Sequence, residues 1–400
     1  MNMLTISTRI EEIVESQTLA MTKKSRELKN QGIDVVNLSI GEPDFDTPKN
    51  ICNAAITAMQ NGFTHYPPVA GFPELRLAIS EKLNHENQLN YKPENILVSN
   101  GAKHSILNVI LSIINPGDEV IIPAPFWVSY PSIIKYAGGI PIEVKSSSET
   151  DFKISATQLE SAITAKTKAI LFSSPCNPSG SVMSKKDLEA WVDVLKNHPN
   201  ILIISDEIYE KINYVDQHHS IASFAEVFNR TVVINGLSKG YAMTGWRMGY
   251  IAGPVEIIAA CEKIQGLMTS GANSIAQMAS IEALCGDQSS VNEMLEIFKS
   301  RRNLFHQALS EIPNLKCNLP EGAFYLFPDV SAFIGKSTPD GEVIQDTEAL
   351  CLYLLNHGHV STVAGTAFGD DNCIRLSYAT SNENLIKAAS RIKEALAALA

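Results

Sequence analysis

Six short, unbroken apolar runs constrain the fold of this chain more than any other feature of its sequence. They are Ile96–Ser99, Val120–Pro123, Ala169–Ser173, Ile201–Ser205, Val232–Asn235 and Tyr250–Ala252. Most of them do not alternate apolar with polar residues, which indicates strands buried on both faces of a sheet. Between them lie helical patterns, such as the apolar residues at positions 106, 109, 110, 113 and 114. This alternation predicts an α/β fold with three layers, in which helices cover both faces of a mainly parallel sheet.

The last quarter of the chain has a different pattern. It predicts a long charged helix over Val291–Leu309, short strands over Leu315–Cys317, Phe324–Phe327 and Ile374–Ser377, and a closing helix over Glu383–Leu399. We therefore expect a second, smaller α+β domain that packs against the first. The large domain would span residues 46–289, and the small one would combine residues 1–45 with residues 290–400.

The charge and the cysteine pattern narrow the class of protein. Acidic residues outnumber basic ones, 43 to 32, and the net charge of −11 disfavours a nucleic-acid partner. The seven cysteines are scattered without a C-x-x-C pair, which disfavours a disulfide framework or a zinc site. His357 and His359 lack further ligands nearby in sequence, so we expect no metal site. No apolar stretch approaches the roughly 18 residues of a membrane span, and we expect a cytoplasmic protein.

Two predicted strands are followed by turns suited to a bound ligand. The segment Gly101–Lys103 opens a helix directly after a strand, where free backbone N–H groups bind phosphate. After the third apolar run, two prolines and a glycine frame Asn177 in a rigid turn that could present its amide to a ring oxygen. Each segment alone could equally be an ordinary helix start or an ordinary turn.

Asp206 stands at the end of a buried strand, where a carboxylate is costly unless it is paired. A protonated ring nitrogen is a suitable partner, because the carboxylate would keep the ring positive and make it an electron sink. Tyr209, three residues later, could hydrogen-bond a ring hydroxyl. The alternative is an aspartate that only caps a helix.

The segment Gly236–Tyr250 carries one lysine, small hydroxyls, one arginine and four glycines. Lys239 could form a Schiff base with an aldehyde, while Ser238 and Arg247 could hold a phosphate on the same molecule. The alternative is a glycine-rich loop with a surface lysine. Because the carboxyl ends of parallel strands meet at one edge of a sheet, we expect these groups to converge there.

An ordered series of motifs along essentially the whole chain resembles a known family. The series is Gly41–Phe45, Tyr66–Gly71, Gly101–Lys103, Phe126–Tyr130, Asn177–Gly180, Asp206–Tyr209, Ser238–Lys239 with Arg247, and Arg375–Tyr378. It is similar to the fold-type I, pyridoxal-phosphate-dependent aminotransferases of class I and II, and within them to the bacterial aspartate aminotransferase branch.

The resemblance implies a role for each of these positions. The catalytic residues would be Lys239, Asp206 and Tyr209. Pyridoxal phosphate would be bound by Gly101, Ala102, Lys103, Trp127, Asn177, Asp206, Tyr209, Ser238, Lys239 and Arg247, and by Tyr66 of a neighbouring subunit in a homodimer. The amino acid or 2-oxo acid substrate would contact Gly41, Trp127, Asn177, Arg375, Lys103, Ser16 and Thr18.

The resemblance also suggests the substrates, with 2-oxoglutarate as the expected acceptor and aspartate as the expected donor. Lys103 would sit near the substrate side chain and favour a second carboxylate. Two departures stand out. Ala102 replaces a glycine common in that branch, and Val14 replaces a basic residue of members that act on prephenate. Aromatic or alanine donors, a cysteine-S-conjugate β-lyase on the same fold, and a non-catalytic sensor module stay open as alternatives.

Overall fold

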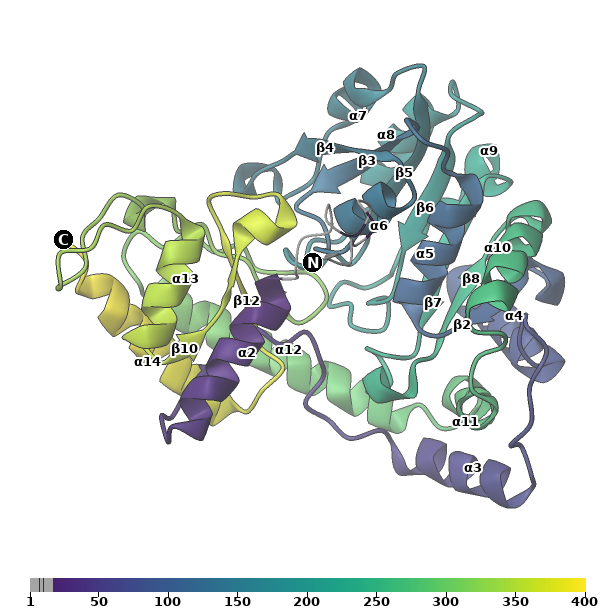
Figure 1. The fold of residues 1–400 in the computed structure, drawn as a ribbon, viewed down its shortest axis with the longest axis horizontal. Helices are drawn as coiled ribbons and strands as arrows, with labels where there is room; N and C mark the ends of the chain where they lie inside the picture. The colour runs from purple at the N-terminus through teal and green to yellow at the C-terminus, as the bar shows by residue number, and fades with distance from the viewer. Residues whose placement is uncertain (1–6, 8–9, 11–16) are drawn as a thin grey trace, which may run out of the picture.

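The structure is a computed structural model that describes residues 7, 10 and 17–400, with side-chain surroundings from residue 20 onward. Its centre is a sheet in the order β2-β8-β7-β6-β5-β3-β4 (Figure 1). The strands are β2 (Ile96–Ser99), β3 (Glu119–Ala124), β4 (Ile140–Lys145), β5 (Thr167–Ser173), β6 (Leu202–Asp206), β7 (Thr231–Gly236) and β8 (Gly249–Ala252). Strand β8 runs opposite to the other six strands of this sheet. The sheet confirms the predicted fold class, and each of the six apolar runs corresponds to a strand.

Strand β4, which the sequence analysis missed, forms an edge of the sheet beside β3. Its residues are exposed or half-buried along its whole length. It therefore lacks the continuous apolar run by which the buried strands were recognised.

Helices cover both faces of this sheet. One face packs against α5 (Ala102–Ile113), α6 (Tyr130–Tyr136) and α10 (Val255–Met268). The other packs against α3 (Lys49–Gln60), α4 (Pro73–Asn87), α7 (Ala156–Ala162), α8 (Lys185–Leu195) and α11 (Ser274–Cys285), with the short α9 (Ala225–Phe228) beside α8. Along β7, neighbouring residues belong to opposite clusters: Val232 and Ile234 face α5, whereas Val233 faces α4 and α11. Both faces are therefore dry, as the apolar runs predicted.

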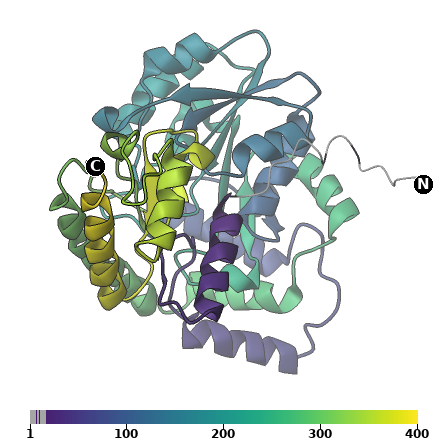
Figure 2. The same cartoon turned by 60° about the vertical axis from the view of Figure 1, so that its left-hand side comes forward.

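Among the residues that the structure describes, the smaller part of the molecule contains two short sheets and four α-helices. Strand β1 (Val36–Asn37) pairs with β10 (Val360–Ser361), and β12 (Ile374–Ser377) lies between β11 (Val363–Ala364) and β9 (Tyr325–Leu326). The helices are α2 (Gln17–Asn30), α12 (Ser289–Ser310), α13 (Thr347–Asn356) and α14 (Asn382–Ala397). Figure 2 shows α2 and the C-terminal helices gathered on the same side of the molecule.

The predicted strand Leu315–Cys317 is wrong. The structure has a single isolated bridge there, between Lys316 and Asp329. Asn314 has a φ of 65°, a left-handed conformation that breaks an extended run just before the segment.

Two connections tie the smaller part to the large sheet. The first turns of helix α12, at Val291 and Met294, pack against α3, α4 and α11. Its later residues Phe298 and Phe305 lie in the core of the smaller part. The segment after β6 also enters that second core through Tyr209. Side chains from both parts therefore meet at the carboxyl end of β6. No helix in the described part of the chain combines the length and the apolar character that a bilayer crossing requires.

Candidate active site

The carboxyl ends of four strands form one edge of the central sheet. Register pairs Ser173 of β5 with Asp206 of β6, and Asp206 with Ile234 of β7. Gly249, the first residue of the antiparallel β8, lies opposite both Ser99 and Gly236. The segments that follow these strands carry Gly101, Asn177 and Lys239, so the turns singled out in the sequence start from a common edge.

Lys239 points toward the N-terminal segment rather than into bulk water. Its Nζ donates a hydrogen bond to the carbonyl oxygen of Gly41 at 2.6 Å. Burial, followed by the positive charge of Arg375, lowers the pKa of Lys239 to about 8, although Glu42 and Asp206 act in the opposite direction. An amine with a lowered pKa spends more time neutral near pH 7–8, which is the form that attacks a carbonyl carbon.

Asp206 is 5% exposed and accepts two hydrogen bonds. Its Oδ2 accepts from the hydroxyl of Tyr130 at 2.7 Å, and its Oδ1 accepts from the backbone N–H of Ile208 at 3.3 Å. Burial raises the pKa of Asp206 to about 6 in spite of these donors. The carboxylate is therefore mostly charged at neutral pH but lacks a formal ion-pair partner among the described residues, which suits it to a cationic ligand.

Arg375 is 2% exposed, and both of its terminal nitrogens donate hydrogen bonds. One terminal nitrogen donates to Asn177 Oδ1 at 3.0 Å and the other to the carbonyl oxygen of Ser39 at 2.7 Å. The guanidinium lies 4.6 Å from the ring centroid of Tyr325 and 5.0 Å from that of Phe368. Its Nε is buried without a hydrogen-bond partner, and no described carboxylate pairs with it. A buried, unbalanced guanidinium of this kind is a site for an incoming carboxylate.

Tyr325 connects the substrate side of the site to Tyr209. The hydroxyls of Tyr209 and Tyr325 are 2.7 Å apart, and both side chains are buried. A side chain at Gly41 would come within 2.7 Å of the Tyr325 hydroxyl, so this glycine permits the N-terminal segment to pass close by. The sequence analysis missed Tyr325 because nothing distinguishes its hydroxyl from that of any core tyrosine in a short strand.

The start of α5 forms a positive cradle. Gly101 has a φ of 84°, and a Cβ there would lie 2.6 Å from the guanidinium of Arg247. A Cβ at Gly249 would lie 2.4 Å from the backbone nitrogen of Ala102. These glycines let the backbone and Arg247 approach each other, while the first N–H groups of the helix have no partner within it. Ser238, next to Lys239 in the chain, is also buried. The cradle can bind a phosphate or another anion.

Trp127 lies half-buried beside Lys103 and Tyr130. The Nζ of Lys103 is 5.0 Å from the Trp127 ring centroid, and the Tyr130 ring meets Trp127 edge-on at 5.5 Å. Partial burial, and then the charge of Arg247, lowers the pKa of Lys103. Lys103 has no carboxylate partner among the described residues, so it is a second cation available to a ligand.

Of the remaining predicted residues, Tyr66 is the one whose side chain the structure describes. The Tyr66 side chain is 92% exposed and projects from the surface. Ser16 and Val14 lie outside the described residues, and Thr18 lies in the first turn of α2 without a described side chain.

Comparison with known proteins bears out the family resemblance. Residues 33–392 match the family model described as aminotransferase class I and II. A Petunia hybrida protein named bifunctional aspartate aminotransferase and glutamate/aspartate-prephenate aminotransferase is 46% identical over 98% of this chain and 83% of its own. An aspartate aminotransferase of a Bacillus species is also 46% identical, over 97% and 98% of the two chains.

Solved structures agree with these sequence relatives. The aspartate aminotransferase of Rhizobium meliloti superposes with a TM-score of 0.97 at 40% identity, over the whole of both chains. That of Thermus thermophilus, solved with maleate, superposes with a TM-score of 0.92 at 39% identity, over 98% of this chain and 100% of the other.

Proposed function

Because the chain belongs to the aminotransferase class I and II family, we propose that it moves the amino group of aspartate to a 2-oxo acid, in the simplest case 2-oxoglutarate. The family assignment makes it a pyridoxal-phosphate-dependent aminotransferase acting on small amino and 2-oxo acids. The proposal for aspartate rests above all on one observation. Two cations, Arg375 beside Asn177 and Lys103 beside Trp127, lack a carboxylate partner among the described residues, and a dicarboxylic substrate has two carboxylates to offer them.

The residues present fit the cofactor. Gly101 and Gly249 let Arg247 and the backbone at the start of α5 approach each other where any side chain would collide, and Asp206 offers a buried anion without a cationic partner among the described residues. When bound, pyridoxal phosphate supplies a protonated ring that withdraws electrons from the substrate Cα. We assign the phosphate to the N–H groups of Ala102 and Lys103, with Gly101, Ser238 and Arg247, and the ring to Asp206, Tyr209, Asn177 and Trp127.

Lys239 has the chemistry for two tasks. Its amine, with a pKa lowered to about 8, would hold the cofactor through the aldehyde carbon. Once a substrate amine replaces it, Nζ would be free to act as a base. It would take up the proton of the substrate Cα and deliver it to the cofactor carbon that had carried the aldehyde. The hydrogen bond from Nζ to Gly41 places the amine beside the segment that we expect to close over the substrate carboxylate, because Gly41 belongs to that segment.

Arg375 would orient every substrate through the α-carboxylate. Asn177 and Ser39 fix two of its nitrogens, and the rings of Tyr325 and Phe368 fix its plane, so the free Nε edge has a defined direction. A planar fork held in this way binds a carboxylate in one orientation. Lys103 would then attract only a side-chain carboxylate, assisted by Ser16 and Thr18.

We further propose a homodimer in which Tyr66 completes the neighbouring site. Tyr66 is 92% exposed, and Leu267 is 90% exposed. The two lie on adjoining segments, since a Cβ at Gly271 would meet Pro67 at 2.7 Å. Large exposed side chains gathered in this way are typical of a surface that another protein covers.

The domain division at residues 46–289, and 1–45 with 290–400, belongs to the same proposal, with the larger part binding the cofactor and the smaller one closing over the substrate. A cytoplasmic location is also part of it. All seven cysteines are free, which suits a reducing compartment.

The test is a donor and acceptor screen with the purified holoenzyme. Aspartate with 2-oxoglutarate should give glutamate, glutamate with oxaloacetate should give aspartate, and borohydride should fix the cofactor on Lys239. A β-lyase would instead release pyruvate and ammonia from a cysteine conjugate, and a broad aminotransferase would use alanine or phenylalanine as readily as aspartate. Label on Lys103 or Lys263 would overturn the assignment of Lys239.

A further inference from the structure

Asp206 depends on a residue to which the proposed function gives no role. Tyr130, the first residue of α6, is fully buried, and its hydroxyl donates to Asp206 Oδ2 at 2.7 Å. We propose that Tyr130 is a positioning residue that fixes the Asp206 carboxylate and keeps it ionised for the cofactor's ring nitrogen. This inference rests on the proposed role of Asp206 as the partner of that nitrogen.

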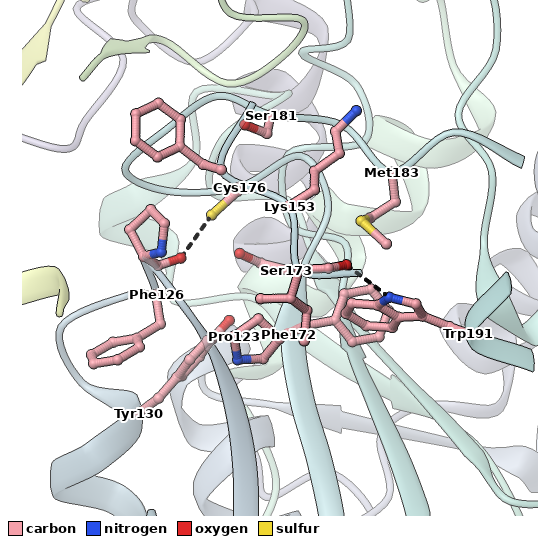
Figure 3. A pocket seen from close by; sticks show the side chains of 13 residues that line it. Pro123, Phe126, Tyr130, Lys153, Phe172, Ser173, Cys176, Ser181, Met183 and Trp191 are labelled. Atoms are coloured by element: carbon pink, nitrogen blue, oxygen red, sulfur yellow. Dashed lines mark hydrogen bonds between the residues drawn. The ribbon is translucent and has the colours of Figure 1, made fainter. Parts of the chain in front are cut away.

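The surroundings of Tyr130 leave its hydroxyl little other use. Figure 3 shows its ring beside Phe126, at the edge of a cavity that also borders Ser173 and Cys176. The cavity measures about 30 Å³, enough to admit water. The same ring meets Trp127 edge-on at 5.5 Å. Tyr130 thus contacts both the proposed stacking residue and the proposed ring-nitrogen partner.

Tyr130 is the stronger of the two hydrogen-bond donors to Asp206, since the N–H of Ile208 is 3.3 Å away. The other groups that face Asp206 act through charge. Glu207 raises its pKa and Lys239 lowers it, while Tyr209 and Cys176 are close enough to respond to its charge. Burial raises the pKa of the Tyr130 phenol well above its ordinary value, so it remains a donor at every pH at which the enzyme works.

The effect of removing this donor can be bounded. A hydrogen bond to a charged group changes an equilibrium by roughly ten- to a hundredfold. Without it, the pKa of Asp206, about 6 in the intact protein, should rise by about one to two pH units. The carboxyl would then be largely protonated at neutral pH in the cofactor-free protein, and it would have to lose its proton before it could pair with a protonated ring.

The experiment compares pyridoxal phosphate binding to the full-length Tyr130→Phe variant and the wild-type chain between pH 5.5 and 9. Wild-type affinity should rise as Asp206 ionises, and the variant should follow the same course displaced upward by about one to two pH units. At pH 6.5 the variant should bind roughly tenfold more weakly, and the two curves should converge near pH 9. Tyr353→Phe is the matched control, because it also removes a buried hydroxyl, bonded to the Ala395 carbonyl, far from the site. Its profile should follow the wild type.

Three outcomes would overturn the proposal. These are a variant that binds as the wild type does, equal weakening at every pH, and the same displacement when Asp206→Asn is already present. Asp206→Asn by itself tests the proposed function separately: an unchanged profile and half-reaction in that variant would remove the role of Asp206, whatever Tyr130 does. Should Tyr130→Phe fold poorly, 3-fluorotyrosine at position 130 is a stronger donor of nearly the same shape and should displace the profile downward.

Discussion

Replacement of Lys103 by alanine should separate dicarboxylic donors from all others. Lys103 Nζ lies 5.0 Å from the Trp127 ring and has no carboxylate partner among the described residues. Lys103→Ala therefore breaks no ion pair of the described structure. Any loss of activity must then come from lost contacts between Lys103 and the bound substrate or cofactor. Aspartate and glutamate should lose a contact that alanine and phenylalanine never make.

The size of the effect follows from the setting of the side chain. A hydrogen bond to a charged group contributes about 1.5–3 kcal/mol. Lys103 remains accessible to solvent, and screening by water favours the lower end of that range, about 1.5–2 kcal/mol, or a ten- to thirtyfold loss in kcat/KM for aspartate. Since partial burial and Arg247 lower the pKa of Lys103, the preference for aspartate should also decline at alkaline pH sooner than for an ordinary lysine.

The donor half-reaction, followed by single-turnover absorbance at saturating pyridoxal phosphate, is the right assay, because 2-oxoglutarate carries a second carboxylate of its own. Lys135→Ala, at an exposed position on α6, is the matched control and should leave all donors unchanged. Equal losses for aspartate and phenylalanine would refute the reasoning and mean that Lys103 serves the helix start or the phosphate.

Four further predictions concern the rest of the site. Asp206→Asn should slow the half-reaction at least about a hundredfold, roughly 3 kcal/mol, in stopped-flow measurements. In the cofactor-free protein the same change should raise the free energy of unfolding at pH 7.5 by up to about 3 kcal/mol: the pKa of Asp206 is raised to about 6, so stability present below about pH 4 is lost as the pH rises through 6. Arg375→Lys should weaken every donor alike in kcat/KM, because a point charge cannot replace the fork; a loss confined to aspartate would contradict this. Mixed dimers of Tyr66→Phe and Lys239→Ala subunits should keep one nearly intact site, and inactive hybrids that assemble correctly would show that each site is built from one chain.

Much of the fold could be predicted from the sequence, because strands that are buried on both faces consist of continuous apolar residues. The run Ile96–Ser99 and the strand Ile374–Ser377 were placed with the observed bounds, since both are buried along their whole length. The same reasoning missed the half-exposed β4 and wrongly assigned Leu315–Cys317, where a left-handed residue and a single bridge replace a strand. The apolar content of a segment indicates whether the segment is buried. It predicts a strand only where the strand is also buried.

The sequence by itself determined which residue types follow each strand, and with them a lysine, a carboxylate and an anion cradle at one sheet edge. Only the tertiary structure decided how these groups are held. Tyr130 reaches Asp206 across 76 positions, and Tyr325 reaches Tyr209 across 116. Asn177 and Ser39 clamp Arg375 from segments 198 and 336 positions away. Such partners leave no local pattern, because a hydrogen bond between distant segments depends on how the layers pack and not on which residues are neighbours in the chain.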